Sequence, residues 1–520
     1  MKRKYATYPD ERFLRIGGIS GGEIGSKLNR SLEKISDRSW LDIVSNNNIP
    51  EDSHKWTQVD ENHAVTSSVW QFSRSLGSIA KRFPERFGQL ALHFPENVHQ
   101  HYVSAIIDAL GEKEAKTDIP EGERADWYPA CVETVEDVIE RFQSRDDRET
   151  AISFCRLIRA RPEEKWSGKT IERLVRYAIS HPDLEPGKLN IYCDKTADVA
   201  SVNMLFQNTI NCVRGVAAEA IGQLLWIHKD LLEKVRPAIV SLVNDPHPAV
   251  RMASIDALLP VLNIDRDLAV SWFCNACEND LRVAASPRAV LFFNRTFSSH
   301  FHQIAPFIRA MVGSPLGEVS EEGAKEVTAR FLFHQMFEQE LIECQKGTTP
   351  RRKGVAQIAA HFLNEKKYTM QCQELLLPLL NDPEKEVRAE TVRMYRFKPF
   401  PNHIFSKDFV EAYIRSKAFA DHPSWIVDSL KNLPDSVVPL AGIIFRICEV
   451  FSTTLREKTR DVGTRVPHTV SDVCSLLLRL YEHAQGLSNT GIADRCLDIW
   501  DMLFENRVGM IRELTRAIEK

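Results

Sequence analysis

The chain has 520 residues, of which 43% are hydrophobic and 27% charged, and its formal net charge is −4. This composition excludes extensive disorder, and the length exceeds the roughly 250–300 residues that one hydrophobic core serves. Several domains or one long repeat array are therefore expected, and the mildly acidic balance disfavours a protein that grips nucleic-acid phosphates.

The apolar segments and the cysteines of the sequence indicate in which cellular compartment the protein is expected. No apolar run approaches the roughly 20 residues that a membrane span requires, and the basic start lacks the apolar stretch of a signal peptide. The eleven cysteines are scattered and odd in number. They predict reduced thiols and a cytoplasmic location.

Residues 1–65 form the least regular part of the sequence. They are rich in glycine, and one helix is predicted where Ser36 can cap the apolar residues that follow. Helical spacing of apolar residues then makes residues 66–200 an N-terminal helical region, with loops at about 111–126 and 181–198. Alternating strand patterns are almost absent, so no substantial sheet is expected.

Residues 201–400 repeat a two-helix pattern. The clearest copies are Leu-Val-Asn-Asp-Pro-His-Pro-Ala-Val-Arg at 242–251 and Leu-Leu-Asn-Asp-Pro-Glu-Lys-Glu-Val-Arg at 379–388. In each copy an apolar helix ends, Asn-Asp-Pro forms the turn, and Val-Arg opens the next helix. The aspartate can accept backbone N–H groups at the new helix start, and the proline fits its first turn.

Weaker copies fill in the array between these two. Their second helices align on a column of mostly small residues, namely Gly215, Met252, Val283, Gly323, Gly354 and Ala389. A period of about 30–40 residues that carries two helices predicts a helical solenoid, in which small residues let helices stack closely. The Asp-Pro turn followed by Val-Arg resembles HEAT repeats. The predicted fold class is all-α: an α-solenoid of HEAT-like repeats behind an irregular N-terminal segment, with residues 401–520 as a C-terminal helical or capping region.

Two arginines recur at the same place in this pattern, Arg251 and Arg388. We interpret them as structural, because an arginine here can bond the carbonyl groups or the aspartate of an adjacent turn. Contact with a ligand is the alternative.

Several short motifs suggest catalysis but lack the context that it needs. Ser20 lies in a Gly-x-Ser-x-Gly pattern without a buried strand before it, and Lys27 follows Ser26 without the Gly-Lys-Ser/Thr ending of a phosphate loop. Cys274 and Cys277 have zinc-ligand spacing but no second pair. We therefore expect a chain that is not an enzyme and that needs no metal or other cofactor.

Two His-x-His pairs are weak metal candidates, His99 with His101 and His300 with His302. Residues i and i+2 point apart on a helix, so joint ligation would require an extended loop. A basic cluster at 346–353 lacks the aromatic residues on which bases stack, and we interpret it as a solvated loop.

A resemblance to a known class rests on four blocks: Ser-Asp-Arg-Ser-Trp-Leu at 36–41, Pro-Glu-Arg-Phe at 84–87, His-Pro-Asp at 181–183 and Ile-Asn-Cys-Val-Arg-Gly-Val-Ala at 210–217. These resemble the C-terminal helical regions of large bacterial signal-transduction NTPases of the STAND or NACHT class. In that class a helical-repeat sensor follows an ATPase module and an effector. The resemblance implies a non-catalytic sensor that binds a protein, such as a phage component, in bacterial antiphage defence.

This chain departs from that class because it has no P-loop. The resemblance then implies an NTPase module elsewhere in the same full-length protein or in a separate subunit. A general HEAT-repeat scaffold or adaptor unrelated to defence is the alternative. A HEAT-like repair enzyme would need a basic concave face and a catalytic acid beside an aromatic residue, and this acidic chain shows neither, so nucleic acid is not the expected partner.

The predicted binding surface lies on the second helices of the repeats. Counting seven residues on from the aligned column gives Arg330, His361 and Arg396, and counting eleven gives Asn294, His334 and Glu365. The two counts differ by one helical turn, so both sets share a face. We predict a polar ladder there that binds a protein through Arg330, His334, His361 and Arg396. An ordinary solvated face is the alternative.

Overall fold

The computed structural model describes residues 23–26, 32–51, 57–58, 63–66, 68–115, 126–185, 187–188, 201–396, 407–457 and 465–505. Ser20 and Lys27 lie outside these described residues. The chain divides into two compact units, residues 1–296 (unit 1) and 297–520 (unit 2). This boundary falls inside the repeat array expected at 201–400. The division into four segments that the sequence suggested stays a prediction.

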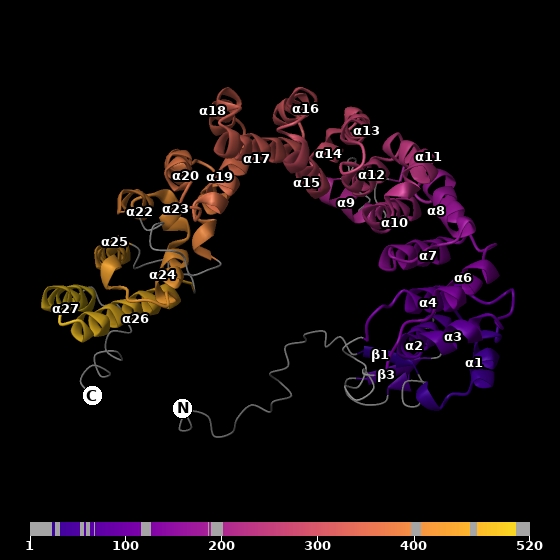
Figure 1. Cartoon of the computed structure of the whole chain (residues 1–520). Coiled ribbons are helices and arrows are strands. Elements are labelled where there is room, and N and C mark those ends of the chain that lie inside the picture. The colour runs from indigo at the N-terminus through magenta and orange to yellow at the C-terminus, as the bar shows by residue number, and fades with distance from the viewer. Residues whose placement is uncertain are drawn as a thin grey trace, which may run out of the picture. The chain divides into compact units, whose positions relative to one another are not determined.

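Unit 1 is built from helices in two layers (Figure 1). In one layer α2, α4, α7, α10 and α12 pack against one another in succession; in the other, α3 contacts α6, and α11 contacts both α8 and α13. The helices of this unit are α1 (Asp37–Val44), α2 (Val69–Arg82), α3 (Pro84–Ala91), α4 (Gln100–Leu110), α6 (Val132–Arg141), α7 (Arg148–Ala160), α8 (Gly168–Ser180), α9 (Val202–Thr209), α10 (Val213–Ile227), α11 (Leu232–Val243), α12 (Pro248–Val261), α13 (Arg266–Glu278), α14 (Leu281–Ala284) and α15 (Pro287–Thr296), with short 3-10 helices η2 (Leu32–Lys34) and η3 (Lys229–Leu231).

Unit 2 continues the same kind of packing. Helix α17 lies between α16 and α19, α19 contacts α18, α20 and α21, and α25, α26 and α27 pack together. Its helices are α16 (Phe301–Gly313), α17 (Gly317–His334), α18 (Glu338–Lys346), α19 (Thr349–Phe362), α20 (Thr369–Leu376), α21 (Lys385–Thr391), α22 (Lys407–Ile414), α23 (Lys417–Asp421), α24 (Pro423–Lys431), α25 (Ala441–Glu457), α26 (Arg465–Gly486) and α27 (Thr490–Glu505), with 3-10 helices η4 (Leu377–Asn381), η5 (Arg393–Arg396) and η7 (Val438–Leu440). The predicted fold class is confirmed: the chain is an α-solenoid of stacked helical repeats.

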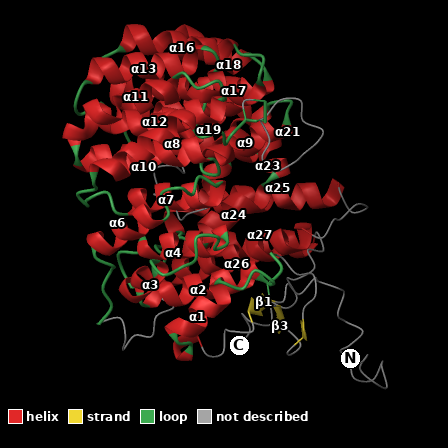
Figure 2. Cartoon of the chain, turned by 90° about the vertical axis from the view of Figure 1, so that its right-hand side faces the viewer, coloured by secondary structure: helices red, strands yellow, loops and turns green. Residues whose placement is uncertain are grey.

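A small sheet in the N-terminal segment departs from the sequence-based expectation. Strand β3 (His63–Thr66) pairs in parallel with β1 (Glu23–Ser26) and antiparallel with β2 (Thr57–Gln58). Figures 1 and 2 show the strands beside α2, which β1 contacts. Strands of two to four residues are too short to give a recognisable alternation of apolar and polar residues.

Helix starts follow the caps that the sequence offers. The hydroxyl of Ser36 accepts a hydrogen bond from the backbone N–H of Ser39 at the start of α1, as predicted. This cap fixes the short helix that buries Trp40, whose side chain is fully buried. Asp147 caps α7 in the same way, accepting from the N–H of Thr150 at 2.9 Å. Each cap satisfies a backbone donor that the helix itself leaves unpaired.

The column of small residues does bring helices close together. A Cβ atom on Gly354 in α19 would lie 2.4 Å from the carbonyl oxygen of Glu321 in α17, and one on Gly323 would lie 2.5 Å from the Val312 nitrogen in α16. One alignment in the column is wrong. Val283 lies in the four-residue helix α14 and not in the longer helix α15 that follows it. Both α14 and α15 pack against α12.

The Asn-Asp-Pro turn is also built as expected, with one difference. Asp245 accepts the backbone N–H of His247 at 2.8 Å, but the proline in the first turn of α12 is Pro248 and not Pro246. The recurring arginines close these turns: Arg251 donates to the carbonyl oxygen of Asp245 at 2.7 Å, and Arg388 makes the equivalent bond in its own repeat. Their structural interpretation is confirmed.

A buried histidine makes the stability of unit 1 depend on pH. His247 is fully buried; its Nδ1 accepts the N–H of Ala249 at 3.0 Å, so its Nε2 carries the proton and donates to the Lys188 carbonyl at 3.1 Å. Burial lowers the pKa of His247, against smaller contributions from Lys188 and Asp245 that raise it. As the pH falls through about 6.5, the unfolded chain therefore binds a proton that the folded chain resists, and stability decreases.

We expect the melting temperature of the wild-type chain to drop between pH 7.5 and pH 5.5, and the drop to be smaller in His247→Asn. An asparagine keeps a capping oxygen but does not titrate. His93→Asn, at an exposed position, is the matched control and should leave the drop unchanged. Equal drops in wild type and His247→Asn would contradict this assignment.

Candidate functional site

The four residues predicted to bind a partner lie in unit 2, but they differ in how far their side chains are exposed to solvent. Arg330 is only 2% exposed and forms an ion pair with Glu326, one turn earlier in α17, at 2.6 Å. Burial raises the pKa of Glu326, although the Arg330 charge opposes this. The guanidinium lies 4.9 Å from the ring centre of Phe297. Arg330 therefore supports the surface from beneath and is not part of an exposed ladder.

The two histidines, in contrast, are exposed. His334 is the last residue of α17 and His361 is the penultimate residue of α19. Partial burial and the nearby Arg330 charge lower the pKa of His334, which favours its neutral form near pH 7. The side chain of Arg396, at the end of η5, lies outside the described residues. Partner binding by these residues stays a prediction.

The structure surrounds both histidines with aromatic rings, which the sequence analysis missed. One triad consists of Phe297, Phe301 and Phe337, with ring centres 5.4–6.0 Å apart. A second triad consists of Phe333, Phe362 and Tyr368, with ring centres 4.9–6.1 Å apart. These separations are typical of favourable edge-to-face contacts between aromatic rings.

The histidines join and extend these triads. The His334 ring lies 5.3 Å from Phe297 in the first triad and 6.4 Å from Phe333 in the second. The His361 ring lies 4.7 Å from Phe362. The eight rings together are called the aromatic cluster below: Phe297, Phe301, Phe333, His334, Phe337, His361, Phe362 and Tyr368.

The aromatic cluster comes from helix ends and turns. Phe333 and His334 end α17, His361 and Phe362 end α19, and the remaining rings precede or begin the next helices. Phe297 and Phe337 are buried, whereas Phe301, Phe333, Phe362 and Tyr368 are half-buried. The cluster thus has a buried base and a row of rings that still present surface to solvent.

Two cations lie over rings of the aromatic cluster, and an exposed methionine follows Tyr368 closely in the sequence. Arg309 lies 5.2 Å from the ring centre of Phe337 and forms an ion pair with Glu340, and Lys367 lies 5.0 Å from the centre of Tyr368. Met370, in the first turn of α20, is 76% exposed. Aromatic residues, methionine and arginine are the residue types that are enriched at the centre of protein interfaces.

The backbone is strained at the centre of the cluster. Gln335 and Phe337 both adopt left-handed conformations, with φ of 57° and 64°. For a bulky residue such as phenylalanine this conformation costs on the order of 1–2 kcal/mol, and it persists only where packing imposes it. The packing of Phe337 against Phe297, Phe301 and Arg309 supplies that constraint.

One metal candidate from the sequence has an unexpected geometry. His99 is the N-cap of α4 with an extended backbone, so the rings of His99 and His101 lie 4.8 Å apart instead of pointing away from each other. Both face Glu51, and His101 also contacts Glu149. Nevertheless, within the described ranges no group of three or more His, Cys, Asp or Glu residues has a geometry suited to a metal ion.

The other candidates have structural roles. Cys277 is buried in α13, and burial raises the pKa of the neighbouring Cys274 to about 11, which disfavours a reactive thiolate. The basic cluster at 346–353 lies partly in a helix and not in a loop, because α19 begins at Thr349. Within it Arg352 binds Asp382 at 2.6 Å and Lys353 binds Glu321 at 3.1 Å. These cations join neighbouring repeats.

Comparison with known proteins leaves the family open. No family model matches the sequence, and no curated protein matches it. A solved structure titled "Kap95:Nup1 complex" is similar at 13% identity and a TM-score of 0.42, covering 93% of this chain and 63% of that chain, so this chain spans less than two thirds of its length. A structure titled "Crystal Structure of Engineered Protein" is similar at 12% identity and a TM-score of 0.24, covering 82% and 98% of the two chains.

These likenesses are too distant to carry an argument about function. Across the described ranges, no helix combines the length and the apolar character that crossing a bilayer requires.

Proposed function

We propose that this chain is a non-catalytic recognition protein that binds a protein partner through the aromatic cluster of unit 2. The observation that carries the proposal is the aromatic cluster itself, eight rings in contact along the ends of α17 and α19 with several of them half-buried or exposed. Large half-exposed rings, with Arg309 against Phe337 and the exposed Met370 two residues after Tyr368, have the composition of an interface centre.

A narrower proposal concerns the biological role. The blocks at 36–41, 84–87, 181–183 and 210–217 support a sensor of the STAND or NACHT class, with the NTPase module elsewhere in the full-length protein or in a separate subunit. Its ligand would be a protein such as a phage component. A general scaffold or adaptor unrelated to defence is the alternative, and purification of the tagged chain from phage-infected and uninfected bacteria distinguishes the two: a phage protein retained only after infection supports the sensor.

The binding surface can be tested with changes confined to exposed side chains. The triple variant His334→Asp, His361→Asp, Met370→Asp should weaken binding of a partner so identified by at least about 30-fold, because even one lost anchor of about 2 kcal/mol gives that factor. Dissociation constants are measured by calorimetry on the purified chain. Arg330 is left intact, since its removal would leave Glu326 as an unpaired buried charge.

A matched control places aspartates at exposed positions at the C-terminal ends of α24 and α26. The variant Asn432→Asp, Gln485→Asp, Leu487→Asp changes two polar residues and one apolar residue that is 63% exposed. It should bind the partner as the wild type does, and both triple variants should keep the wild-type melting temperature within a few degrees. Unchanged affinity of the cluster variant, with its fold intact, would rule out this surface.

A further inference from the structure

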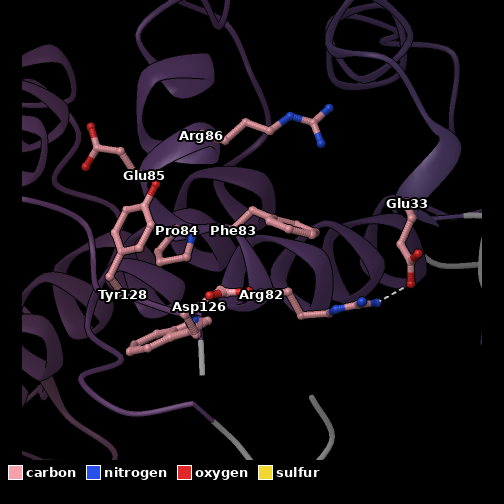
Figure 3. A pocket seen from close by; sticks show the side chains of 9 residues that line it. Glu33, Arg82, Phe83, Pro84, Glu85, Arg86, Asp126 and Tyr128 are labelled. Carbon is pink, nitrogen blue, oxygen red and sulfur yellow. Dashed lines mark hydrogen bonds and ion pairs between the residues drawn. The ribbon is translucent and has the colours of Figure 1, made fainter. Parts of the chain in front are cut away.

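A cavity in unit 1 combines aromatic faces with carboxylates. Its volume is about 270 Å³, and it is lined by Glu33, Arg82, Phe83, Pro84, Glu85, Arg86, Asp126, Trp127 and Tyr128. Figure 3 shows Tyr128 and Pro84 on one side of Phe83 and the ion pair between Arg82 and Glu33 on the other. Tyr128 is 65% exposed and Phe83 is 39% exposed, which is unusual for side chains of this size.

The walls of the cavity are held in place by hydrogen bonds. The Trp127 indole N–H donates to the carbonyl oxygen of Lys81, at the end of α2, at 2.8 Å, which fixes the ring. Glu85 accepts from the Thr134 hydroxyl at 2.6 Å and from the Cys131 N–H at 2.9 Å. Burial raises the pKa of Glu85, but these hydrogen bonds outweigh it and lower the pKa overall, so Glu85 is ionised at neutral pH.

Each of the two arginines that line the cavity contacts both an aromatic ring and a carboxylate. Arg82 lies 5.6 Å from the ring centre of Phe83 and pairs with Glu33. Arg86 lies 5.0 Å from the ring centre of Phe87 and pairs with Asp37 at 2.6 Å. Each guanidinium thus sits between an aromatic face and a carboxylate, an arrangement in which stacking and ion pairing reinforce each other.

The cavity contains a third group of aromatic rings and a carboxylate, but no cation among the described residues lies between them. Trp127 and Tyr128 present their rings next to the carboxylate of Asp126, yet among the described residues no arginine or lysine lies over either ring and none pairs with Asp126. The cavity lining holds three carboxylates and two guanidiniums, and the second guanidinium is already neutralised by Asp37 from outside the lining. Among the described residues, Glu85 and Asp126 are then left without a cation, so the cavity is complementary to added positive charge.

We propose that this cavity is a second binding site, which takes the side chain of an arginine from a protein partner. The guanidinium stacks on Tyr128 and Trp127 and pairs with Asp126, in the same way as Arg82 and Arg86 do with their own neighbours. A planar guanidinium fits better than a lysine ammonium, because it stacks on an aromatic face while its edge binds a carboxylate. The site is independent of the aromatic cluster in unit 2 and goes beyond the proposed function.

The test uses N-acetyl-L-arginine amide as the probe and the full chain as the receptor. Saturation-transfer difference NMR, which detects weak ligands of large proteins, should show saturable binding. The isosteric neutral analogue N-acetyl-L-citrulline amide should bind at least tenfold more weakly, since it loses the charge. Asp126→Asn and Tyr128→Ala should each weaken arginine binding at least fivefold, whereas Glu133→Gln, which removes an exposed carboxylate of α6, should leave it unchanged.

Several outcomes would overturn the proposal. Absence of saturable arginine binding would do so, as would equal binding of citrulline or equal affinity in wild type and both cavity variants. Binding of N-acetyl-L-proline amide as strong as that of arginine would instead indicate a proline-rich ligand. Both substitutions lie on the surface, and an unchanged melting temperature shows that the helices are intact.

Discussion

Replacing Arg214 by alanine should lower the free energy of unfolding of unit 1 by about 3–5 kcal/mol, the largest effect that we expect of a single substitution. The guanidinium donates to the carbonyl oxygens of His181 at 2.6 Å and Leu184 at 2.8 Å. Its Nε lies 2.8 Å from a carboxylate oxygen of Asp245, and the side chains of this ion pair are 8% and 6% exposed.

The cost arises mainly from what the substitution leaves behind. Without Arg214, the buried carboxylate of Asp245 keeps its charge but loses its cation, and two carbonyl groups lose a donor. The double variant Arg214→Met, Asp245→Asn should therefore be less destabilised than the sum of its two single variants predicts. Such a coupling would show that the two residues stabilise the fold through their ion pair, and not only through the packing of each side chain.

An exposed ion pair supplies the control. Arg236→Ala breaks a pair with Glu233, one turn earlier in α11, whose side chains are 40% and 75% exposed, and should cost under about 1 kcal/mol. Urea unfolding followed by circular dichroism measures both variants. If Arg214→Ala were within about 1 kcal/mol of the wild type, the buried network would not stabilise the junction between these repeats.

The second large effect concerns the glycine column. Gly354→Ala should destabilise unit 2 by about 1–3 kcal/mol, because the new Cβ would lie 2.4 Å from the Glu321 carbonyl oxygen and 2.9 Å from the Ala324 Cβ. Alanine is otherwise the better helix former by about 1 kcal/mol. The clash between α19 and α17 thus reverses the sign that helix propensity alone would give.

Gly442→Ala is the matched control for this substitution. Gly442 lies in α25, where nothing is within 4 Å of the added Cβ. The same chemical change should therefore be neutral or stabilising by up to about 1 kcal/mol. Opposite signs at the two positions, measured as shifts in melting temperature, are the expected result, whereas stabilisation by both would show that α17 and α19 are not in close contact.

Much of the fold could be predicted from the sequence because the signals are local. The cap at Ser36 and the arginine of the Val-Arg turn at Arg251 act over a few residues, and both are found as expected. The three-stranded sheet could not be predicted, since its strands are short and β1 pairs with residues of β3 that lie 40 positions further along the chain. The closeness of His99 and His101 depends on a single extended residue at a helix start, which spacing alone does not reveal.

The candidate site was predictable only in part, for the same reason. Helical spacing placed His334 and His361 on one face, but it could not show that the Arg330 side chain turns inward to Glu326. The aromatic cluster unites rings from the turns of successive repeats, so no single sequence window contains it. One signal was available: an aromatic residue adjoins a histidine at the end of two second helices, as Phe333-His334 and His361-Phe362.

Site-specific photo-crosslinking tests the recognition surface most directly. A photoreactive phenylalanine analogue is placed singly at position 361, in the aromatic cluster, or at position 370, two residues after Tyr368. The control positions are 432, which directly follows α24, and 485, in α26. The proposed function predicts a covalent adduct with the purified partner from positions 361 and 370 and none from 432 and 485. Adducts from 432 or 485 alone, with a partner that still binds, would contradict recognition through the aromatic cluster.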